Sequence, residues 1–581
     1  EGREEWYEEN YQFLLSLQKD GLEDWNQVAF LFRSVQSDRA VGLANYLEEK
    51  GIPVYSPRSN QFFDREEIKL IIGLFIFLFP KYFTIRKWNE NLKLAIWDYY
   101  DQQCIPLISE ELKKVENQDL LKWAQERART HHQLVDNTDY GFTALFYQAL
   151  QFPLFSRYFA DEALNGLDKG RAARNLSKFS SLLAKFEYLH YVTVISEEFL
   201  DKNLTDLFNQ YFRFLKDGGI GEYEDDSEYA PSGCVSFLTI HQSKGLEYPV
   251  VVTCSLEGVP KKSHDHLDEI LENNYFSKPP YEPFNLIKNF DFWRLYYTAF
   301  SRAQNLSVLS AEIKNGRGPS PSKYFRSVVD GLVSWRHPEL DLSEIEFAQV
   351  KEMNLKREYA FTSHILLFEA CPEQYRFFKE LEFHPVRAGA QIFGTLVHQT
   401  IEDIHKAVLR NESHLVTHEQ IQSWLNTNYI YLSKKERQFL APSTIKAIEK
   451  HVLNYYDREK QHLHRLQEAE VEISLVKDQY ILKGSIDLIR GEDGTVEIID
   501  FKSERKPDLE KEKSRLETYQ RQLQLYAHLL EEKTGQTVSR MHLYYTGESD
   551  GSPYVSFEKK TDQIEKTVKQ FDQVVARIEA K

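Results

Sequence analysis

The chain has 581 residues and a formal net charge of −17, and 42% of its side chains are hydrophobic and 14% aromatic. At roughly 100–200 residues per domain, this length implies three to five domains and excludes a single small fold. The hydrophobic fraction is large enough to fill extensive cores, which excludes a disordered or low-complexity chain.

Cysteine usage and the longest apolar run exclude further classes. The four cysteines lie far apart, with no pair at zinc-ligand spacing and none after Cys371. We therefore expect no zinc, no iron–sulfur cluster and no disulfide scaffold, which fits a reducing cytoplasm. The longest apolar run, Leu70–Pro80, has only 11 residues, so we interpret it as a buried helix and expect no membrane partner.

The start of the chain and the distribution of charge are also informative. The sequence begins at Glu1, and its opening stretch lacks the basic start and apolar core of a secretory signal, so we expect a fragment of a longer protein. Residues 361–581 carry a net charge of −4 and the preceding 360 residues carry −13. The acidic balance disfavours nonspecific polyanion binding, although a cleft can still be locally basic. The last third is the part that repels phosphates least.

The first elements in chain order predict an α/β unit that is opened by a helical insertion and then resumed. Apolar spacings of three and four predict mostly helix over residues 70–220. Short β-rich runs before and after this stretch predict strands near 26–33, 52–55, 234–240, 248–254 and 306–310, with helices up to Lys50 and over 290–303.

A turn-rich segment at 316–322 and a polar stretch at 336–358 predict a domain boundary. The pattern after it predicts a separate domain of about 220 residues, with a sheet and flanking helices. We expect helices near 363–380, 393–409, 441–461, 514–534 and 562–580, and strands near 470–477, 479–490, 495–502 and 539–546.

One predicted hairpin in this domain carries the chemistry. Two β-rich runs flank Asp493-Gly494, a strong signal for a two-residue type I′ turn, because both central residues need a positive φ. This turn fixes the register and places Asp487 directly opposite Asp500. Opposed side chains share a face with Cβ atoms ~4.5–5.5 Å apart, and the alternation of the strand adds Lys502 to that face.

Two opposed carboxylates repel each other, and their ionised forms are costly in a partly desolvated site unless a cation neutralises them. Oxygen ligands of this kind suit Mg²⁺ or Mn²⁺, which typically bind one or two carboxylates plus phosphate oxygens of a substrate. The metal can polarise a phosphoryl oxygen and activate a bound water, while Lys502 orients that water or stabilises the developing charge. The pattern therefore predicts phosphodiester hydrolysis with Mg²⁺ or Mn²⁺ as cofactor.

These residues resemble the motifs of the PD-(D/E)XK nucleases, specifically of their RecB-like branch. Four elements occur in the family's order: a G-x-x-x-H motif, a G-S-I-D sequence, a D-x-K element and a Q-x-x-x-Y motif. The first motif ends at His398 and the second ends at Asp487. The D-x-K element is Asp500-Phe501-Lys502, and the Q-x-x-x-Y motif begins at Gln522 and ends at Tyr526. The segment from Cys371 to Tyr375 also resembles the N-terminal helix of that family.

The resemblance implies a role for each of these residues. His398, Asp487 and Asp500 would bind the metal, with the Phe501 carbonyl as a further ligand, and Lys502 would be catalytic. Gln522 and Tyr526 would shape the site or contact the nucleic-acid strand. Some members of the family hold an iron–sulfur cluster on cysteines, and this chain lacks the C-terminal cysteines for one.

Each residue alone also has an ordinary explanation. Asp500 and Lys502 would form an exposed ion pair on a strand. His398 would be a packing residue or one half of an i,i+4 pair with Glu402. The glutamine and tyrosine of the Q-x-x-x-Y motif would belong to the core and cap of a helix. The joint occurrence of all four elements in family order favours the nuclease.

The front part resembles the UvrD-like superfamily 1 DNA helicases. Residues 237–252 and 293–304 resemble motifs V and VI, and residues 29–34 and 62–69 resemble the motif IV region. By this resemblance, Arg33 and Arg302 reach the γ-phosphate of a nucleotide in an interdomain cleft, and Glu247 accepts the ribose hydroxyl. The loop between nucleotide and single strand would contain the nucleic-acid-binding residues Thr239, His241, Gln242, Ser243 and Lys244.

The chain contains no G-x-x-x-x-G-K-[ST] phosphate loop and no strand ending in paired acids that would hold nucleotide magnesium. We therefore expect ATP to bind and turn over only with the missing N-terminal RecA-like domain or with a separate motor subunit. Alternatively, this half of the chain has become a DNA-binding scaffold.

The two resemblances imply an α/β chain with a RecA-like domain interrupted by a helical insertion, followed by a PD-(D/E)XK nuclease domain whose central mixed sheet is flanked by helices. The expected parts are the second RecA-like domain (1–70 and 231–315), the insertion subdomain (71–230), a linker (316–358) and the nuclease domain (359–581).

These parts predict the C-terminal portion of a cytoplasmic, ATP-dependent DNA helicase–nuclease, in which a motor feeds single-stranded or unwound DNA to a metal-dependent nuclease. One alternative is a non-catalytic scaffold that binds DNA for a partner enzyme, as the missing phosphate loop and the acidic charge would allow. Another is an intact helicase whose nuclease fold only guides the strand. Exonuclease and endonuclease modes, DNA and RNA substrates, and DNA repair and defence pathways all stay open.

Overall fold

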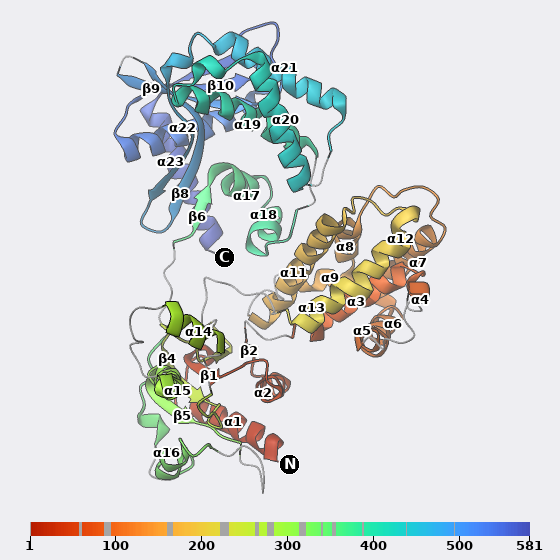
Figure 1. Cartoon of the computed structure of the whole chain (residues 1–581), viewed down its shortest axis with the longest axis vertical. Coiled ribbons are helices and arrows are strands. Elements are labelled where there is room, and N and C mark those ends of the chain that lie inside the picture. The colour runs from red at the N-terminus through yellow and green to blue at the C-terminus, as the bar shows by residue number, and fades with distance from the viewer. Residues whose placement is uncertain are drawn as a thin grey trace. The chain divides into compact units, whose positions relative to one another are not determined.

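The structure is a computed structural model that describes residues 2–56, 61–85, 95–159, 167–220, 230, 232–261, 266–275, 284–312, 321–337, 341–350, 356–385, 389–436, 439–492 and 494–580. The chain divides into two compact units, whose elements are labelled in Figure 1. The first unit comprises Glu1–Phe186 and Thr193–Asn354, and the second consists mainly of Leu355–Lys581. No helix in the described ranges combines the length and the apolar composition that a membrane crossing requires.

The described part of the first unit contains a five-stranded sheet in the order β2-β3-β1-β4-β5, and every neighbouring pair is parallel. The central strand is buried at all five residues, as expected for a parallel sheet that is covered on both faces. The strands are β1 (Val28–Phe32), β2 (Val54–Tyr55), β3 (Val235–Thr239), β4 (Tyr248–Thr253) and β5 (Ala303–Leu309).

Helices interrupt this sheet between β2 and β3, which confirms the predicted α/β class with a helical insertion. The helices that lie outside the insertion, before, between or after the strands in the sequence, are α1 (Gly2–Lys19), α2 (Asp38–Glu49), α14 (His266–Tyr275), α15 (Phe284–Phe300) and α16 (Arg326–Gly331). The insertion contains α3 (Glu66–Leu78), α4 (Tyr82–Ile85), α5 (Ala95–Tyr99), α6 (Ile105–Glu111), α7 (Gln118–His132), α8 (Phe142–Leu150), α9 (Pro153–Ser156), α11 (Leu167–His190), α12 (Glu197–Leu204) and α13 (Phe212–Gly218).

The second unit is built on a mixed sheet in the order β11-β10-β9-β8-β6, with β7 also paired to β8. The pairs β6–β8 and β9–β10 are parallel, and the pairs β7–β8, β8–β9 and β10–β11 are antiparallel. The strands are β6 (Glu358–Ala360), β7 (Leu466–Val476), β8 (Ile481–Glu492), β9 (Thr495–Lys502), β10 (Val538–Tyr545) and β11 (Tyr554–Glu558).

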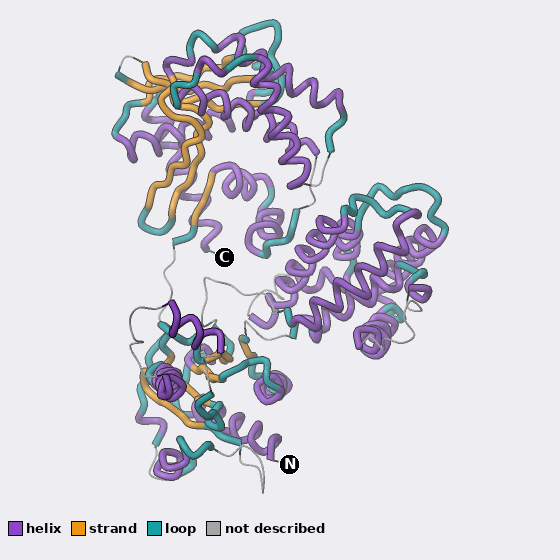
Figure 2. The backbone as a smooth tube through the Cα atoms, viewed as in Figure 1, coloured by secondary structure: helices purple, strands orange, loops and turns teal. Residues whose placement is uncertain are grey.

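Helices pack on both faces of this sheet (Figure 2). One core joins α22 (Lys513–Thr534) and α23 (Thr561–Glu579) to strand residues such as Ile498, and the other joins α19 (Gly389–Leu409), α20 (His418–Glu436) and α21 (Pro442–Glu459) to residues such as Ile499. Adjacent residues of β9 therefore point to opposite cores, as the period of a strand requires.

The predicted hairpin register is confirmed. Glu492 pairs with Thr495 and Leu488 pairs with Ile499 across β8 and β9. Gly494 has a φ of +79°, as the turn requires, and Asp493 lies outside the described residues.

The predicted helix over 363–380 is wrong as a single element. Cys371 is extended, with a φ of −160°, and separates α17 (Leu367–Ala370) from α18 (Pro372–Tyr375). Pro372 follows directly, and proline disfavours helical backbone in the residue before it. The sequence patterns also missed α1, α20 and the short strands β6 and β11.

We predict that Gly484→Val destabilises the second unit by about 1–3 kcal/mol, because overpacking forces neighbours out of place. A Cβ at Gly484 would lie 2.9 Å from ring atoms of Tyr526 and 2.9 Å from Leu529 on α22. Urea unfolding measures the change. Gly551→Val is the control, since the nearest atom to its Cβ is 3.9 Å away. An unchanged unfolding midpoint for Gly484→Val would contradict the close packing of α22 on β8.

Candidate active site

The site lies where two antiparallel strands separate. The ladder between β8 and β9 ends at Leu488 and Ile499, and Asp487 and Asp500 are the next residues in its register. Beyond the ladder, the N–H of Phe501 donates to Asp487 Oδ2 at 2.7 Å. The carboxylate thereby satisfies a buried backbone donor and is fixed at the mouth of the fork.

Helix α19 brings His398 to this fork. A Cβ at Gly394 would lie 3.2 Å from Ser503 Oγ, so the absence of a side chain lets the helix approach the end of β9. One turn later, His398 Nδ1 lies 3.7 Å from Asp487 Oδ2, and the ring packs edge-on against Phe501. Glu402, the alternative partner considered for this histidine, forms an ion pair with Lys406.

Asp500 has partners from its own strand and from α22. The ammonium of Lys502 lies 2.6 Å from Asp500 Oδ2, as the shared strand face predicted. Gln522 donates one hydrogen bond to Asp500 Oδ1 at 3.1 Å and another to the Tyr526 hydroxyl at 2.9 Å. The Q-x-x-x-Y pair therefore holds a carboxylate in place.

All seven residues predicted for the nuclease site line one cavity of about 470 Å³. The structure thus brings together His398, Asp487, Asp500, Phe501, Lys502, Gln522 and Tyr526. The remaining lining residues are Ser485, Ser503, Glu504, Arg515 and Tyr519. The backbone of Phe501 acts to raise the pKa of His398, although burial outweighs this effect.

Burial and crowding of like charges set the protonation of the site. Burial, together with repulsion by Asp500 and Glu470, raises the pKa of Asp487 well above its usual range. Burial lowers the pKa of His398, so its imidazole is neutral at pH 7. Burial opposes the charge of Lys502, but the neighbouring Asp500 outweighs it and raises the pKa of the amine. Lys502 is therefore a cation at neutral pH.

Glu470 on β7 is a site residue that sequence reasoning missed. Its carboxylate lies within 4.8 Å of ligand atoms of both His398 and Asp487. Burial, reinforced by repulsion from Glu402, raises the pKa of Glu470 to about 7. The pairs on either side, Ala469 with Leu488 and Val471 with Ile486, place it opposite Asp487. The three alternating acids at 468, 470 and 472 were a signal, but not one that singled out this residue.

The donor set fits a hard divalent cation. Ligand atoms of His398, Glu470 and Asp487 lie within 4.8 Å of one another. Asp500 and Phe501 line the same cavity as His398 and Asp487, together with the cationic side chains of Lys502 and Arg515. Such oxygen-rich sets suit Mg²⁺ or Mn²⁺, and a cation would relieve the repulsion that raises the carboxyl pKa values.

The residues predicted for nucleotide contact lie on three loops of the first unit, after β1, before β4 and before β5. The guanidinium of Arg302 donates to the carbonyls of Thr298 at 3.1 Å and Leu246 at 2.9 Å, which places it beside Glu247. Glu247 accepts a hydrogen bond from Gln304 at 3.0 Å. Arg33 follows β1 and packs against the loop at Gly258, where a Cβ would lie 3.3 Å from its Nη1.

The loop that is predicted to bind a nucleic-acid strand is a compact turn after β3. Thr239 and Gln242 exchange hydrogen bonds of 2.9 and 3.2 Å between side chains and backbone N–H groups. Ser243 is buried and donates to the Ile240 carbonyl at 2.9 Å, so its hydroxyl stabilises the turn. His241 and Lys244 are exposed, so a nucleic-acid strand can reach these two side chains of the loop.

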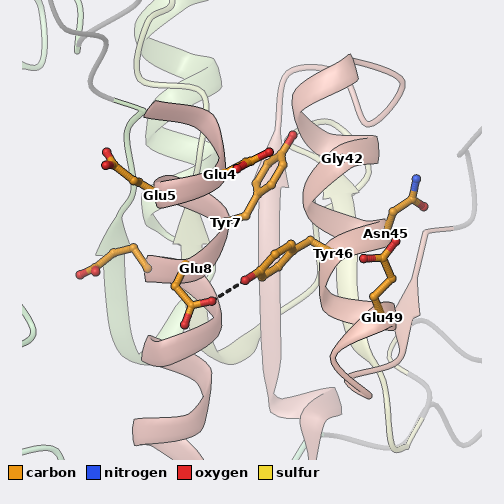
Figure 3. Close-up of a pocket in the computed structure, with 9 residues that line it drawn as sticks. Glu4, Glu5, Tyr7, Glu8, Gly42, Asn45, Tyr46 and Glu49 are labelled. Atoms are coloured by element: carbon orange, nitrogen blue, oxygen red, sulfur yellow. Dashed lines mark hydrogen bonds between the residues drawn. The ribbon is translucent and has the colours of Figure 1, made fainter. Parts of the chain in front are cut away.

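A second cavity, of about 770 Å³, lies between α1 and α2 of the first unit (Figure 3). Its lining includes five glutamates: Glu4, Glu5, Glu8, Glu9 and Glu49. Tyr46 donates to Glu8 across the cavity. This concentration of carboxylates repels phosphates, so the cavity is unsuited to a nucleic-acid backbone.

Two family models match parts of the chain. Residues 362–581 match the PD-(D/E)XK nuclease superfamily, and residues 85–312 match the UvrD-like helicase C-terminal domain. These matches agree with the two resemblances seen in the sequence. No curated protein matches the chain.

Two solved structures show weak likenesses. A protein from Eubacterium rectale that is named as an exonuclease has 12% identity and a TM-score of 0.24, with 35% of this chain and 72% of that chain covered. The protein SSO0001 has 18% identity and a TM-score of 0.18, with 32% of this chain and 85% of that chain covered. At these TM-scores, neither likeness carries an argument about function.

We predict that a divalent cation stabilises the second unit more at pH 8 than at pH 5.5. Asp487 and Glu470 have raised pKa values in the folded chain, so their contribution to stability is present at low pH and is lost as the pH rises through the folded pKa values, about 7 for Glu470. A cation that binds the ionised carboxylates restores that stability. Thermal unfolding with and without Ca²⁺ measures the effect. A Ca²⁺ stabilisation that does not change with pH would contradict the site.

Proposed function

We propose that this chain, which carries a UvrD-like helicase C-terminal domain followed by a PD-(D/E)XK nuclease domain, hydrolyses phosphodiester bonds of DNA with Mg²⁺ or Mn²⁺ as the nuclease part of a helicase–nuclease. The observation that carries the proposal is the convergence of Asp487, Asp500, His398 and Lys502 on one cavity at the strand fork. DNA is the proposed partner, and the cytoplasm is the proposed location.

The proposed metal ligands are His398, Asp487, Asp500, the Phe501 carbonyl and Glu470. When bound, the cation would polarise a phosphoryl oxygen and lower the pKa of a water ligand. The hydrogen bond from Gln522 keeps Asp500 directed into the cavity, and the bond from the Phe501 N–H does the same for Asp487. Both carboxylates are therefore oriented before a cation arrives.

The charge state of Lys502 agrees with both roles considered for it, orienting the attacking water and stabilising the developing charge. Its raised pKa keeps the amine protonated, so it is a poor proton acceptor from water at neutral pH. A fixed ammonium instead stabilises negative charge that develops on the transferred phosphoryl group. We accordingly assign Lys502 to charge stabilisation and to hydrogen bonding of the attacking water.

For the first unit, we propose the role of the second nucleotide-cleft domain of a motor. Arg33 directly follows β1, at the carboxyl edge of the parallel sheet, where ligand sites of α/β sheets form. Arg302 directly precedes β5, at the amino edge of the same sheet. A phosphate loop from an N-terminal domain or a separate subunit would complete the cleft and couple ATP turnover to strand movement.

We predict that Asp487→Asn, Asp500→Asn and Lys502→Ala each lower cleavage of single-stranded DNA by about 100-fold or more, because each removes charge stabilisation from the transition state. A fluorescent oligonucleotide assay with Mg²⁺ measures this. Asp478→Asn and Lys483→Ala are matched controls at exposed positions of the same unit and should keep full activity. Cleavage that persists in all three site variants would overturn the proposal, and an inactive wild type that binds DNA would favour the scaffold.

We predict that Arg302→Ala abolishes DNA-stimulated ATP turnover once a domain with a phosphate loop is supplied. Loss of the guanidinium removes charge neutralisation at the γ-phosphate. The same variant should cleave short single strands at the wild-type rate, because the nuclease residues all lie in the second unit. Arg326→Ala, at an exposed position on α16 of the same unit, is the control. Unchanged ATP turnover in Arg302→Ala would contradict the nucleotide role.

A further inference from the structure

One face of α22 supplies more of the site than the Q-x-x-x-Y motif. Arg515, Tyr519, Gln522 and Tyr526 follow one another at spacings of four, three and four residues, and all of them line the nuclease cavity. Residues at these spacings lie on one side of a helix. Nothing in the motifs discussed above assigns a role to Tyr519.

Tyr519 covers the amine that the mechanism uses. Lys502 Nζ lies 4.1 Å from the centre of the Tyr519 ring and 2.6 Å from Asp500 Oδ2. The Lys502 side chain is 17% exposed. An ammonium over the face of an aromatic ring is attracted by the ring's quadrupole, and this attraction strengthens when water is excluded. Lys502 is therefore held from two sides, by a carboxylate and by a ring.

The ring is itself held in orientation by polar contacts at the rim of the cavity. The Tyr519 hydroxyl accepts a hydrogen bond from Arg515 Nε at 3.2 Å. Arg515 also donates to Glu504 at 2.6 Å and to Glu512 at 3.1 Å. These contacts restrict rotation of the tyrosine and keep its face toward the lysine.

The two contacts of Lys502 respond differently to a bound cation. Asp500 is one of the proposed metal ligands, so a divalent cation would compete with the ammonium for the same carboxylate and would also repel it. The ring of Tyr519 is neutral and is not a proposed metal ligand, so a cation would not compete for its contact with the ammonium. With a cation on Asp500, the ring would be the contact that keeps the ammonium in the cavity.

We propose that Tyr519 is a positioning residue that retains the Lys502 ammonium in the active site when the metal binds Asp500. This inference rests on the proposed nuclease function. It assigns the contact with the ammonium to the aromatic face, while the hydroxyl only helps to orient the ring, so phenylalanine should largely replace tyrosine and leucine should not.

The test compares Tyr519→Leu with Tyr519→Phe in the full chain. We expect Leu to lower kcat for single-stranded DNA by about tenfold with KM within twofold, because an aromatic–cation contact in a desolvated site is lost. Phe should keep at least about half of the wild-type kcat, since its ring presents the same face. The control is Tyr431→Leu, which removes a similar lysine–tyrosine contact on α20, 5.8 Å from Lys435, and should be neutral.

A second measurement reads the position of the amine without activity. Trace acetylation with Ca²⁺ present, followed by mass spectrometry, should label Lys502 several-fold faster in Tyr519→Leu than in the wild type or Tyr519→Phe. Calorimetry should give the same Ca²⁺ affinity for all three proteins. Equal losses in Leu and Phe, or unchanged labelling of Lys502 in Leu, would overturn the role of Tyr519. A wild type without nuclease activity would instead overturn the proposed function, and the labelling would still decide the inference.

Discussion

The fork between β8 and β9 is the constraint on which the site depends. If the ladder continued past Leu488 and Ile499, the backbone of Phe501 would be committed to cross-strand pairing. The strands instead separate, and the Asp487 carboxylate takes the Phe501 N–H. One side chain thus satisfies the backbone donor that the β8–β9 ladder leaves unpaired and stands at the opening. The neighbouring acid, histidine and lysine can converge there because the fork leaves room between the strands.

The same hairpin shows how structural charges differ from functional ones. At its closed end, Arg490 pairs with Glu459 at 3.2 Å and with Glu497 at 3.4 Å, and Arg465 adds a contact to Glu497 at 3.0 Å. Each buried acid there has a guanidinium partner. At the open end, burial, reinforced by repulsion from neighbouring acids, raises the pKa values of Asp487 and Glu470. Unmatched buried acids are costly for folding and point to a ligand that supplies the missing charge.

The sequence predicts those parts of the site that have a local sequence signal. Asp493-Gly494 defines a turn whose geometry fixes the register, so the Asp487–Asp500 relation followed from counting residues. The turn between β7 and β8, at 477–480, has no such signature, and Glu470 therefore could not be placed opposite Asp487 in advance. Glu470 also has a φ of +51°, which no sequence pattern announces for a glutamate. Tyr519 shares a helix period with the Q-x-x-x-Y motif, but the contact with Lys502 depends on how α22 packs on the sheet.

Charge distribution limits where the first unit can meet a nucleic acid. The first 360 residues, which include this unit, carry −13 of the net charge of −17, and the cavity between α1 and α2 concentrates five glutamates. Phosphates are repelled from that face at distances up to about a Debye length, ~8–10 Å at physiological salt. The turn after β3 differs, because it exposes Lys244 and His241 and buries the polar groups of Thr239 and Ser243 in its own hydrogen bonds. A nucleic-acid strand that contacts this unit therefore gains most binding energy at the carboxyl end of β3, where ligand sites of parallel α/β sheets also form.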